Sequence, residues 1–102
     1  MGKKRLKLLH LTLKKKWFDM ILSGEKTEEY RDIKPYWKSR LEGRDFAHHR
    51  VVFRNGYGAH APLILVELKE ITTGIGKLEW GAPETTPVYI LKLGEILWQP
   101  KD

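Results

Sequence analysis

The sequence of 102 residues contains no cysteine. A chain without thiols forms no disulfide, binds no metal through thiolates and has no cysteine nucleophile. This absence fits a reducing compartment, and we expect the protein in the cytoplasm. No apolar run approaches the roughly 20 residues of a membrane-spanning helix, and the basic start lacks the small-residue cleavage site of a signal peptide. The sequence therefore predicts no membrane association.

Positive charge dominates, since 19 Lys and Arg residues outnumber 13 Asp and Glu residues and give a net charge of +6. A basic surface attracts polyanions and speeds their encounter, so RNA or a nucleotide is the natural partner class. Four Trp and four Tyr residues are available to stack on bases. A solvated, soluble surface is the alternative explanation. Seven of the Lys and Arg residues lie within the first sixteen positions, namely Lys3, Lys4, Arg5, Lys7, Lys14, Lys15 and Lys16.

The spacing of the apolar residues divides the chain into helices and strands. Residues 14–24 and 34–43 have helical spacing and end in glycine, and Pro35 suits the first turn of the second helix. Gly94 is expected to mark a bulge in the last strand. Alternating runs predict strands at residues 6–13, 26–32, 49–55, 61–74 and 88–98, the last of which can divide in two.

These elements predict a single domain over residues 1–102, mainly β with two short helices, which is an α+β fold. Strands outnumber helices and do not alternate with them, so we expect a small, mostly antiparallel sheet curled into a barrel. The predicted inward side chains are Leu9, Leu11, Leu13, Ile64, Val66 and Leu68 in strands and Tyr36, Trp37 and Leu41 in the second helix.

The run SGEKTEEYRD, residues 23–32, concentrates charge where a strand is predicted to begin. Gly24 can turn the chain out of the preceding helix with a positive φ. Glu29 and Arg31 lie two apart on a strand, so they can pair and leave Arg31 with spare donors for a phosphate or a base edge. Lys26 can reach the same place, and desolvation or proximity to Arg31 would lower its pKa and make it a base or nucleophile. A solvated edge strand whose charges discourage aggregation is the alternative.

The pattern Gly24-x-Lys26-x-x-Glu29-x-Arg31 resembles the G-x-K-x-x-E-x-R signature of ASCH domains, which belong to the PUA-like β-barrel superfamily. It follows a strand, a Trp-bearing helix and ILSG, and the later runs PLILVELKEITTG and VYILKLGEIL occur where such domains have them. The resemblance implies a small PUA-like barrel with a cleft for RNA or a modified nucleoside around the signature. These four residues would then line the cleft.

The resemblance also implies two enzyme activities, ribonuclease action and amide hydrolysis of N4-acetylcytidine. In a small hydrolase of either kind, Lys26 would activate water or substrate, Glu29 would relay protons and Arg31 would stabilise developing negative charge. The amidohydrolase members carry threonine at the position of Glu29, and the nearest candidate here for their further glutamate is Glu79. Whether this chain is an enzyme stays open, and a protein-interaction adaptor is a third alternative.

Aromatic and basic residues outside the signature are further candidates. Lys14 lies at the start of the first predicted helix, where a cation is poorly placed for the helix dipole. Contact with a phosphate is one role for it, and a solvated face is the alternative. Tyr57 and Trp80 lie in predicted loops, where a large aromatic side chain either anchors the loop or stacks on a base. Trp17 and Trp37 have helical spacing and are predicted core residues.

The four histidines show no metal-binding pattern. His10 lies beside leucines in a strand and is predicted to be structural. His48, His49 and His60 lack the spacing of zinc ligands and have no cysteine to complete a set. We therefore predict no metal and no cofactor, and a monomer is the default expectation.

Overall fold

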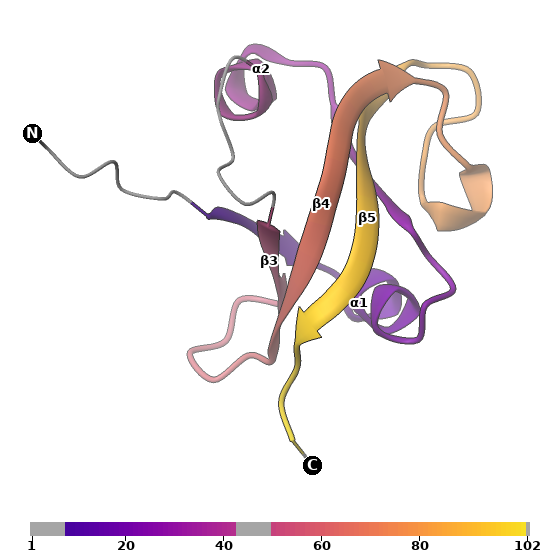
Figure 1. The fold of residues 1–102 in the computed structure, drawn as a ribbon. Coiled ribbons are helices and arrows are strands. Elements are labelled where there is room, and N and C mark those ends of the chain that lie inside the picture. The colour runs from indigo at the N-terminus through magenta and orange to yellow at the C-terminus, as the bar shows by residue number, and fades with distance from the viewer. Residues whose placement is uncertain (1–7, 43–49, 102) are drawn as a thin grey trace, which may run out of the picture.

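One curled sheet organises the fold (Figure 1). The computed structural model describes residues 8–42 and 50–101, and the strands of these ranges lie in the order β1-β3-β4-β5-β2. β1 and β3 are parallel, while the other three neighbouring pairs are antiparallel, which confirms the predicted mainly β, mostly antiparallel sheet. The strands are β1 (Leu9–Leu13), β2 (Glu28–Asp32), β3 (Arg50–Asn55), β4 (Leu63–Gly74) and β5 (Val88–Trp98).

Two short α-helices lie between β1 and β3 in the sequence. α1 (Lys15–Leu22) follows β1, and α2 (Pro35–Leu41) follows β2, so both predicted helices are confirmed. Proline at the first turn of α2 suits a helix start, because its φ is already helical and an N–H there would have no intrahelical partner. The turn after α1 contains Gly24, whose φ of 87° is the positive value expected from the sequence.

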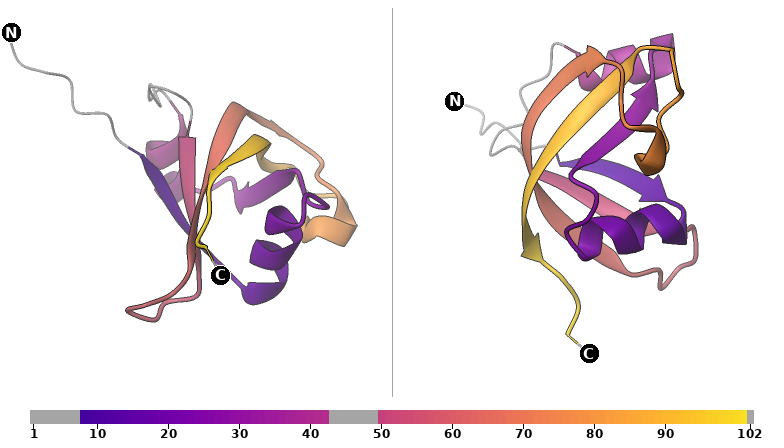
Figure 2. Two further views of the ribbon diagram at one scale, coloured as in Figure 1. Left: turned by 60° about the horizontal axis from the view of Figure 1, so that its bottom comes forward. Right: turned by 90° about the vertical axis from the view of Figure 1, so that its right-hand side faces the viewer.

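The sheet curves into a half-barrel that is open between β1 and β2 (Figure 2). Among the described residues, β1 and β2 each pair with one neighbour only, β3 and β5 respectively. Register shifts between β4 and β5 accompany the curvature. Gly94 lies at one of these irregularities, where a Cβ atom would stand 1.8 Å from a carboxylate oxygen of Glu67. The predicted bulge at Gly94 is therefore confirmed.

The main hydrophobic core fills the inner face of the half-barrel. α1 contributes Phe18 and Ile21, and β5 contributes Leu91 and Leu93. A smaller cluster, in which Trp80 packs against its neighbours, joins β2 and β5 to the loop between β4 and β5. The residues of β1 and β4 that alternation placed inward are all buried, namely Leu9, Leu11, Leu13, Ile64, Val66 and Leu68.

The second helix contributes less to the core than the sequence predicts. Leu41 is buried and Trp37 packs against the core, but Tyr36 is 55% exposed, so the prediction that Tyr36 is buried is wrong. Residues four apart share a helix face, as Trp37 and Leu41 do, whereas a residue five positions before Leu41 points away from it. The guanidinium group of Arg40 lies over one face of the Tyr36 ring, and the residue stays exposed.

Some sequence predictions concern residues outside the described ranges. They are the helix end at Gly43 and the assignments of Lys3, Lys4, Arg5, Lys7, His48 and His49.

The loop between β4 and β5 packs closely against aromatic rings because two of its residues are glycine. It contains the one-turn 3-10 helix η1 (Leu78–Trp80). A Cβ atom on Gly76 would stand 2.6 Å from the ring of Tyr30, and one on Gly81, whose φ is 97°, would stand 2.9 Å from the ring of Trp17. Carbon atoms do not approach this closely without a shift, so the observed packing of the loop requires glycine at both positions.

Gly76→Ala is expected to lower the free energy of unfolding by about 1–3 kcal/mol, because the added methyl group overpacks against Tyr30 and Ala82. Gly58→Ala is the matched control, since a Cβ atom there meets nothing within 4 Å. The control should change the free energy by less than about 0.5 kcal/mol. Urea denaturation measures both variants, and equal stabilities would contradict the close packing of this loop on Tyr30.

Candidate functional site

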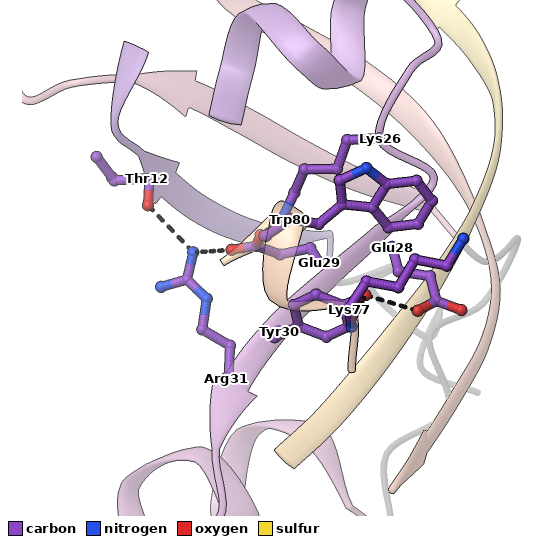
Figure 3. A network of polar contacts seen from close by, with 8 residues as sticks. All are labelled: Thr12, Lys26, Glu28, Glu29, Tyr30, Arg31, Lys77 and Trp80. Atoms are coloured by element: carbon purple, nitrogen blue, oxygen red, sulfur yellow. Dashed lines mark hydrogen bonds and ion pairs between the residues drawn. The ribbon is translucent and has the colours of Figure 1, made fainter. Parts of the chain in front are cut away.

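Three charged side chains of the signature form a continuous line at the opening between β1 and β2 (Figure 3). Glu29 lies at the centre, with Oε1 3.1 Å from Lys26 Nζ and Oε2 accepting a 2.8 Å hydrogen bond from Arg31 Nη2. The side chains of Lys26, Glu29 and Arg31 are 1%, 8% and 19% exposed. The predicted pairing of Glu29 with Arg31 is confirmed, and Lys26 joins the pair.

Strand register explains why two of these charges face the interior. Glu29 and Arg31 have the same parity on β2 and stand opposite Leu91 and Tyr89 of β5. Directly opposed residues of an antiparallel pair lie on the same face of the sheet. Because Leu91 and Tyr89 are buried on the inner face, Glu29 and Arg31 point into the half-barrel.

Arg31 bridges the two end strands of the sheet. Its Nη2 atom also donates a 3.1 Å hydrogen bond to the backbone carbonyl of Thr12 on β1. The guanidinium carbon lies 5.0 Å from the ring centre of Trp37, at cation–π distance. Within the described part of the chain, the buried Nε atom has no hydrogen-bond partner. Arg31 therefore links strands that are not neighbours in the sheet and keeps unused donor capacity.

Lys26 is enclosed by two aromatic rings. Its Nζ atom lies 4.8 Å from the ring centre of Trp17 and 5.0 Å from that of Tyr30, and it donates a 2.5 Å hydrogen bond to the backbone carbonyl of Trp80. Burial lowers the pKa of Lys26 from its ordinary value, and this effect outweighs the opposing attraction of Glu29. The conditional prediction of a lowered pKa is therefore confirmed, with desolvation as its main cause.

Hydrogen bonds of Tyr30 attach the η1 loop to this arrangement. The Tyr30 hydroxyl donates to Glu28 Oε1 at 2.7 Å and accepts from the backbone N–H of Lys77 at 3.0 Å. Burial raises the pKa of Tyr30 above its ordinary value. The Lys77 ammonium lies 4.2 Å from the ring centre of Trp80. Glu79 is exposed on this loop and does not belong to the line of charges.

A cleft of about 470 Å³ opens beside Arg31. It brings together four residues that the sequence singled out, Lys14, Glu29, Arg31 and Tyr57. They come from the start of α1, from β2 and from the turn after β3, where Tyr57 is 89% exposed. The remaining lining residues are Thr12, Leu13, Trp17 and Gly56. The volume lies in the range of about 300–1,000 Å³ that is usual for small-molecule sites.

Three other candidates do not line this cleft. Gly24 and Lys26 line a separate hollow of about 450 Å³ together with residues of β5. Trp80 packs against the smaller core cluster and presents its carbonyl to Lys26, which makes it a loop anchor, one of the two roles considered for it. Lys26 thus adjoins the cleft through its contacts with Glu29 and Trp17.

Four groups at the site were not among the sequence candidates. Trp17 and Trp37 pack against the core as predicted, but each ring also lies beside a cation of the site. Tyr30 has the opposite strand parity from Glu29, and the carbonyl of Thr12 carries no sequence signal because every residue has one. The one available signal was the presence of a tryptophan in each helix that flanks the signature.

The described histidines lie apart from the cleft. His10 is exposed on β1, and His60 lines a different hollow. Within residues 8–42 and 50–101, no group of three side chains of the metal-binding types could hold a metal ion. Over the same two ranges, neither helix combines the length and the apolar character needed to cross a membrane.

The chain matches no family model, no curated protein and no solved structure. Function is therefore inferred from the geometry of the cleft and its line of charges.

Removing Glu29 should leave Lys26 and Arg31 without their shared carboxylate, and removing Arg31 should leave Glu29 with Lys26 alone, in a largely buried place. Glu29→Ala and Arg31→Ala are each expected to lower the free energy of unfolding by about 1–3 kcal/mol. The double variant should cost less than the sum of the two, because the residues interact directly. A double-mutant cycle by urea denaturation measures this coupling.

The exposed Lys15–Asp19 pair on α1 is the control for this cycle. Alanine substitutions there should each change the free energy of unfolding by less than about 0.5 kcal/mol, with additive effects. The same small and additive effects at Glu29 and Arg31 would contradict their coupling and favour the alternative of a solvated edge strand.

Lys26 should make stability rise with pH. The unfolded chain holds this proton up to about pH 10.5, whereas the folded chain releases it at a lower pH because the pKa is lowered. Between these two values the unfolded state binds more protons, so the free energy of unfolding increases with pH. Wild type should therefore gain stability relative to Lys26→Met as the pH approaches 10.5.

Chemical denaturation of both proteins across a pH series measures this difference. Tyrosine titration is common to the two proteins and cancels. A difference in unfolding free energy that does not change with pH would contradict a lowered pKa of Lys26.

Proposed function

We propose that this chain is an ASCH-type domain of the PUA-like superfamily that binds RNA or a nucleoside in the cleft beside Arg31. The observation that carries the proposal is the convergence of Lys14, Glu29, Arg31 and Tyr57 on one cleft. These residues come from three separate segments of the chain. Glu29 and Arg31 belong to the sequence signature. Lys14 and Tyr57 are indicated by the sequence alone, as a basic and an aromatic residue.

The charges of the cleft suit an anionic ligand. Glu29 is shared between Lys26 and Arg31, so one carboxylate meets two cations and the three side chains sum to +1. Lys14 at the cleft wall raises this sum to +2. Arg31 is already held by Glu29 and by the carbonyl of Thr12, so it loses little freedom when a ligand binds. A phosphate oxygen is the acceptor that such donors fit.

Aromatic rings at the same cleft offer surface for a base. Trp17 lines the cleft, and the Tyr57 ring is exposed at its turn. Stacking of a base on an aromatic side chain contributes about 1–3 kcal/mol and tolerates any base, since every base has a π-face. Fixed cations next to aromatic rings are the combination by which proteins bind single-stranded nucleic acid.

The geometry supports ligand binding better than it supports hydrolysis catalysed by Lys26 and Glu29. Lys26 Nζ is bonded to Glu29 and to the Trp80 carbonyl, lies between two rings and does not line the cleft. Both oxygens of Glu29 are engaged by cations. Hydrolysis of N4-acetylcytidine or of RNA is therefore the weaker alternative, because neither group is available to a substrate without rearrangement.

Tryptophan fluorescence tests the proposal, because Trp17 lines the cleft and reports its occupancy. We expect uridine 5′-monophosphate and a short single-stranded RNA to bind, and to bind more weakly as salt is raised from about 20 to about 200 mM. Lys14→Gln should weaken RNA binding, and Tyr57→Ala should weaken it by about tenfold. Lys69→Gln, which changes an exposed lysine on β4, is the control and should have little effect.

Absence of binding by both ligands at low salt would overturn the proposal. Equal losses for Lys14→Gln and Lys69→Gln would mean that only overall charge matters, and the cleft would carry no function. Incubation of the protein with N4-acetylcytidine and with single-stranded RNA tests the hydrolase alternative, for which no turnover is expected. Turnover that is abolished by Lys26→Ala and retained by Lys69→Gln would favour the hydrolase instead.

A further inference from the structure

A row of cations and aromatic rings continues from the cleft onto α2. Arg31 lines the cleft and lies 5.0 Å from the ring centre of Trp37. The rings of Trp37 and Tyr36 meet edge to face with their centres 4.8 Å apart. The guanidinium carbon of Arg40 lies 3.5 Å from the ring centre of Tyr36. These four side chains form one continuous row, which we call the α2 ladder.

The outer part of the α2 ladder is exposed and basic. Tyr36 and Arg40 are both exposed. Lys38 adds a further exposed cation to the same helix, and α2 contains no acidic residue. The ladder is therefore a basic, aromatic surface that directly adjoins the proposed binding cleft.

The acidic residues that flank α2 in the described chain are engaged elsewhere. Asp32 lies 3.3 Å from Lys34 Nζ, in an exposed ion pair. Glu42 accepts a hydrogen bond from the hydroxyl group of Tyr89. Neither carboxylate is paired with Arg40 or Lys38, and among the described residues no ion pair neutralises these two cations.

We propose that the α2 ladder extends the cleft into a track for a single-stranded nucleic acid of several nucleotides. The inference rests on the proposed function, because the cleft holds one nucleotide of that strand. The adjoining nucleotide stacks on the exposed ring of Tyr36, and Arg40 and Lys38 contact its phosphates. A row of rings and cations matches a single strand, in which every nucleotide offers a base face and a phosphate.

Two other occupants fit this surface less well. Protein–protein interfaces share the arginine and aromatic residues of the ladder but are depleted of lysine, whereas Lys38 is exposed on α2 and Lys14 lines the adjoining cleft. A duplex presents its bases in a closed stack, so their faces cannot reach Tyr36. Single-stranded RNA and single-stranded DNA share the required chemistry, and the experiment separates them.

The test compares uridine 5′-monophosphate, octauridylate and octathymidylate as ligands of wild type, Tyr36→Ser and Tyr57→Ala, with affinities measured by fluorescence titration. Tyr36→Ser should weaken octanucleotide binding by about tenfold and leave mononucleotide binding unchanged. Tyr57→Ala should weaken both. For each ligand, the affinity of wild type is compared with that of the variants. Affinities of different ligands are not compared, because an octanucleotide offers several equivalent binding positions. Tighter binding of either octanucleotide to wild type than to Tyr36→Ser supports the track, and the two ligands show whether it accepts RNA, DNA or both.

Two further variants separate stacking from charge and from loss of structure. Tyr36→Phe keeps the ring and should retain octanucleotide binding. Arg40→Gln should reduce the slope of log affinity against log salt by about one for the octanucleotide only, since one phosphate contact is removed. Lys101→Gln is the control and should leave the slope unchanged, because it changes an exposed lysine in the segment after β5, which leads away from α2 (Figure 1).

Each outcome bears on one proposal or the other. Equal octanucleotide affinity for wild type and Tyr36→Ser, with mononucleotide binding intact, would overturn the track and leave the cleft proposal standing. Octanucleotide binding that is lost in Tyr36→Ser and untouched in Tyr57→Ala would overturn the cleft as the binding site. Loss of binding in both Tyr36→Ser and Tyr36→Phe would overturn a stacking role for the ring. Absence of binding by all three ligands would overturn both proposals.

Discussion

The carboxylate of Glu29 binds two cations at once, and much of the structure is arranged around that shared charge. One oxygen holds Lys26, which is sealed from solvent, and the other holds Arg31, which reaches across to the opposite edge of the sheet. Inside a small domain, charges are screened far less than in water. Two cations meeting there without a carboxylate would repel each other and open the half-barrel. The rings of Trp17 and Tyr30 add weaker attraction to the more deeply buried cation.

Much of the fold can be predicted from the sequence. One face of the curled sheet is buried, so apolar and polar residues alternate along its strands. In β1 and β4 every inward leucine, isoleucine and valine of the pattern is buried, as Leu11 and Val66 illustrate. The pairing of Glu29 with Arg31 follows from the same period of two, since residues two apart on a strand must point the same way. Gly24 likewise combines with the end of an apolar helical pattern to indicate a turn with positive φ.

The rest depends on contacts between distant segments, for which the sequence carries no local signal. Lys26 is capped by the carbonyl of Trp80 and Arg31 by that of Thr12, and backbone carbonyls are present at every position. Tyr36 is assigned to the core by its aromatic character alone, although helix geometry turns it away from the buried face. The walls of the cleft likewise meet because of the order of the strands in the sheet. The alternation of side chains within a single strand does not determine that order.

The pairing of β2 with β5, the last strand of the chain, also determines when the site can form. Lys26 reaches a carbonyl 54 residues further along the chain, and Arg31 joins β2 to a strand that pairs with β3. Contacts between residues so far apart in sequence form slowly, because the intervening chain must lose its freedom before it gains any attraction. No fragment that ends before β5 contains both the inward face of β2 and its partner strand. The nascent chain can therefore complete its line of charges only after β5 has been synthesised.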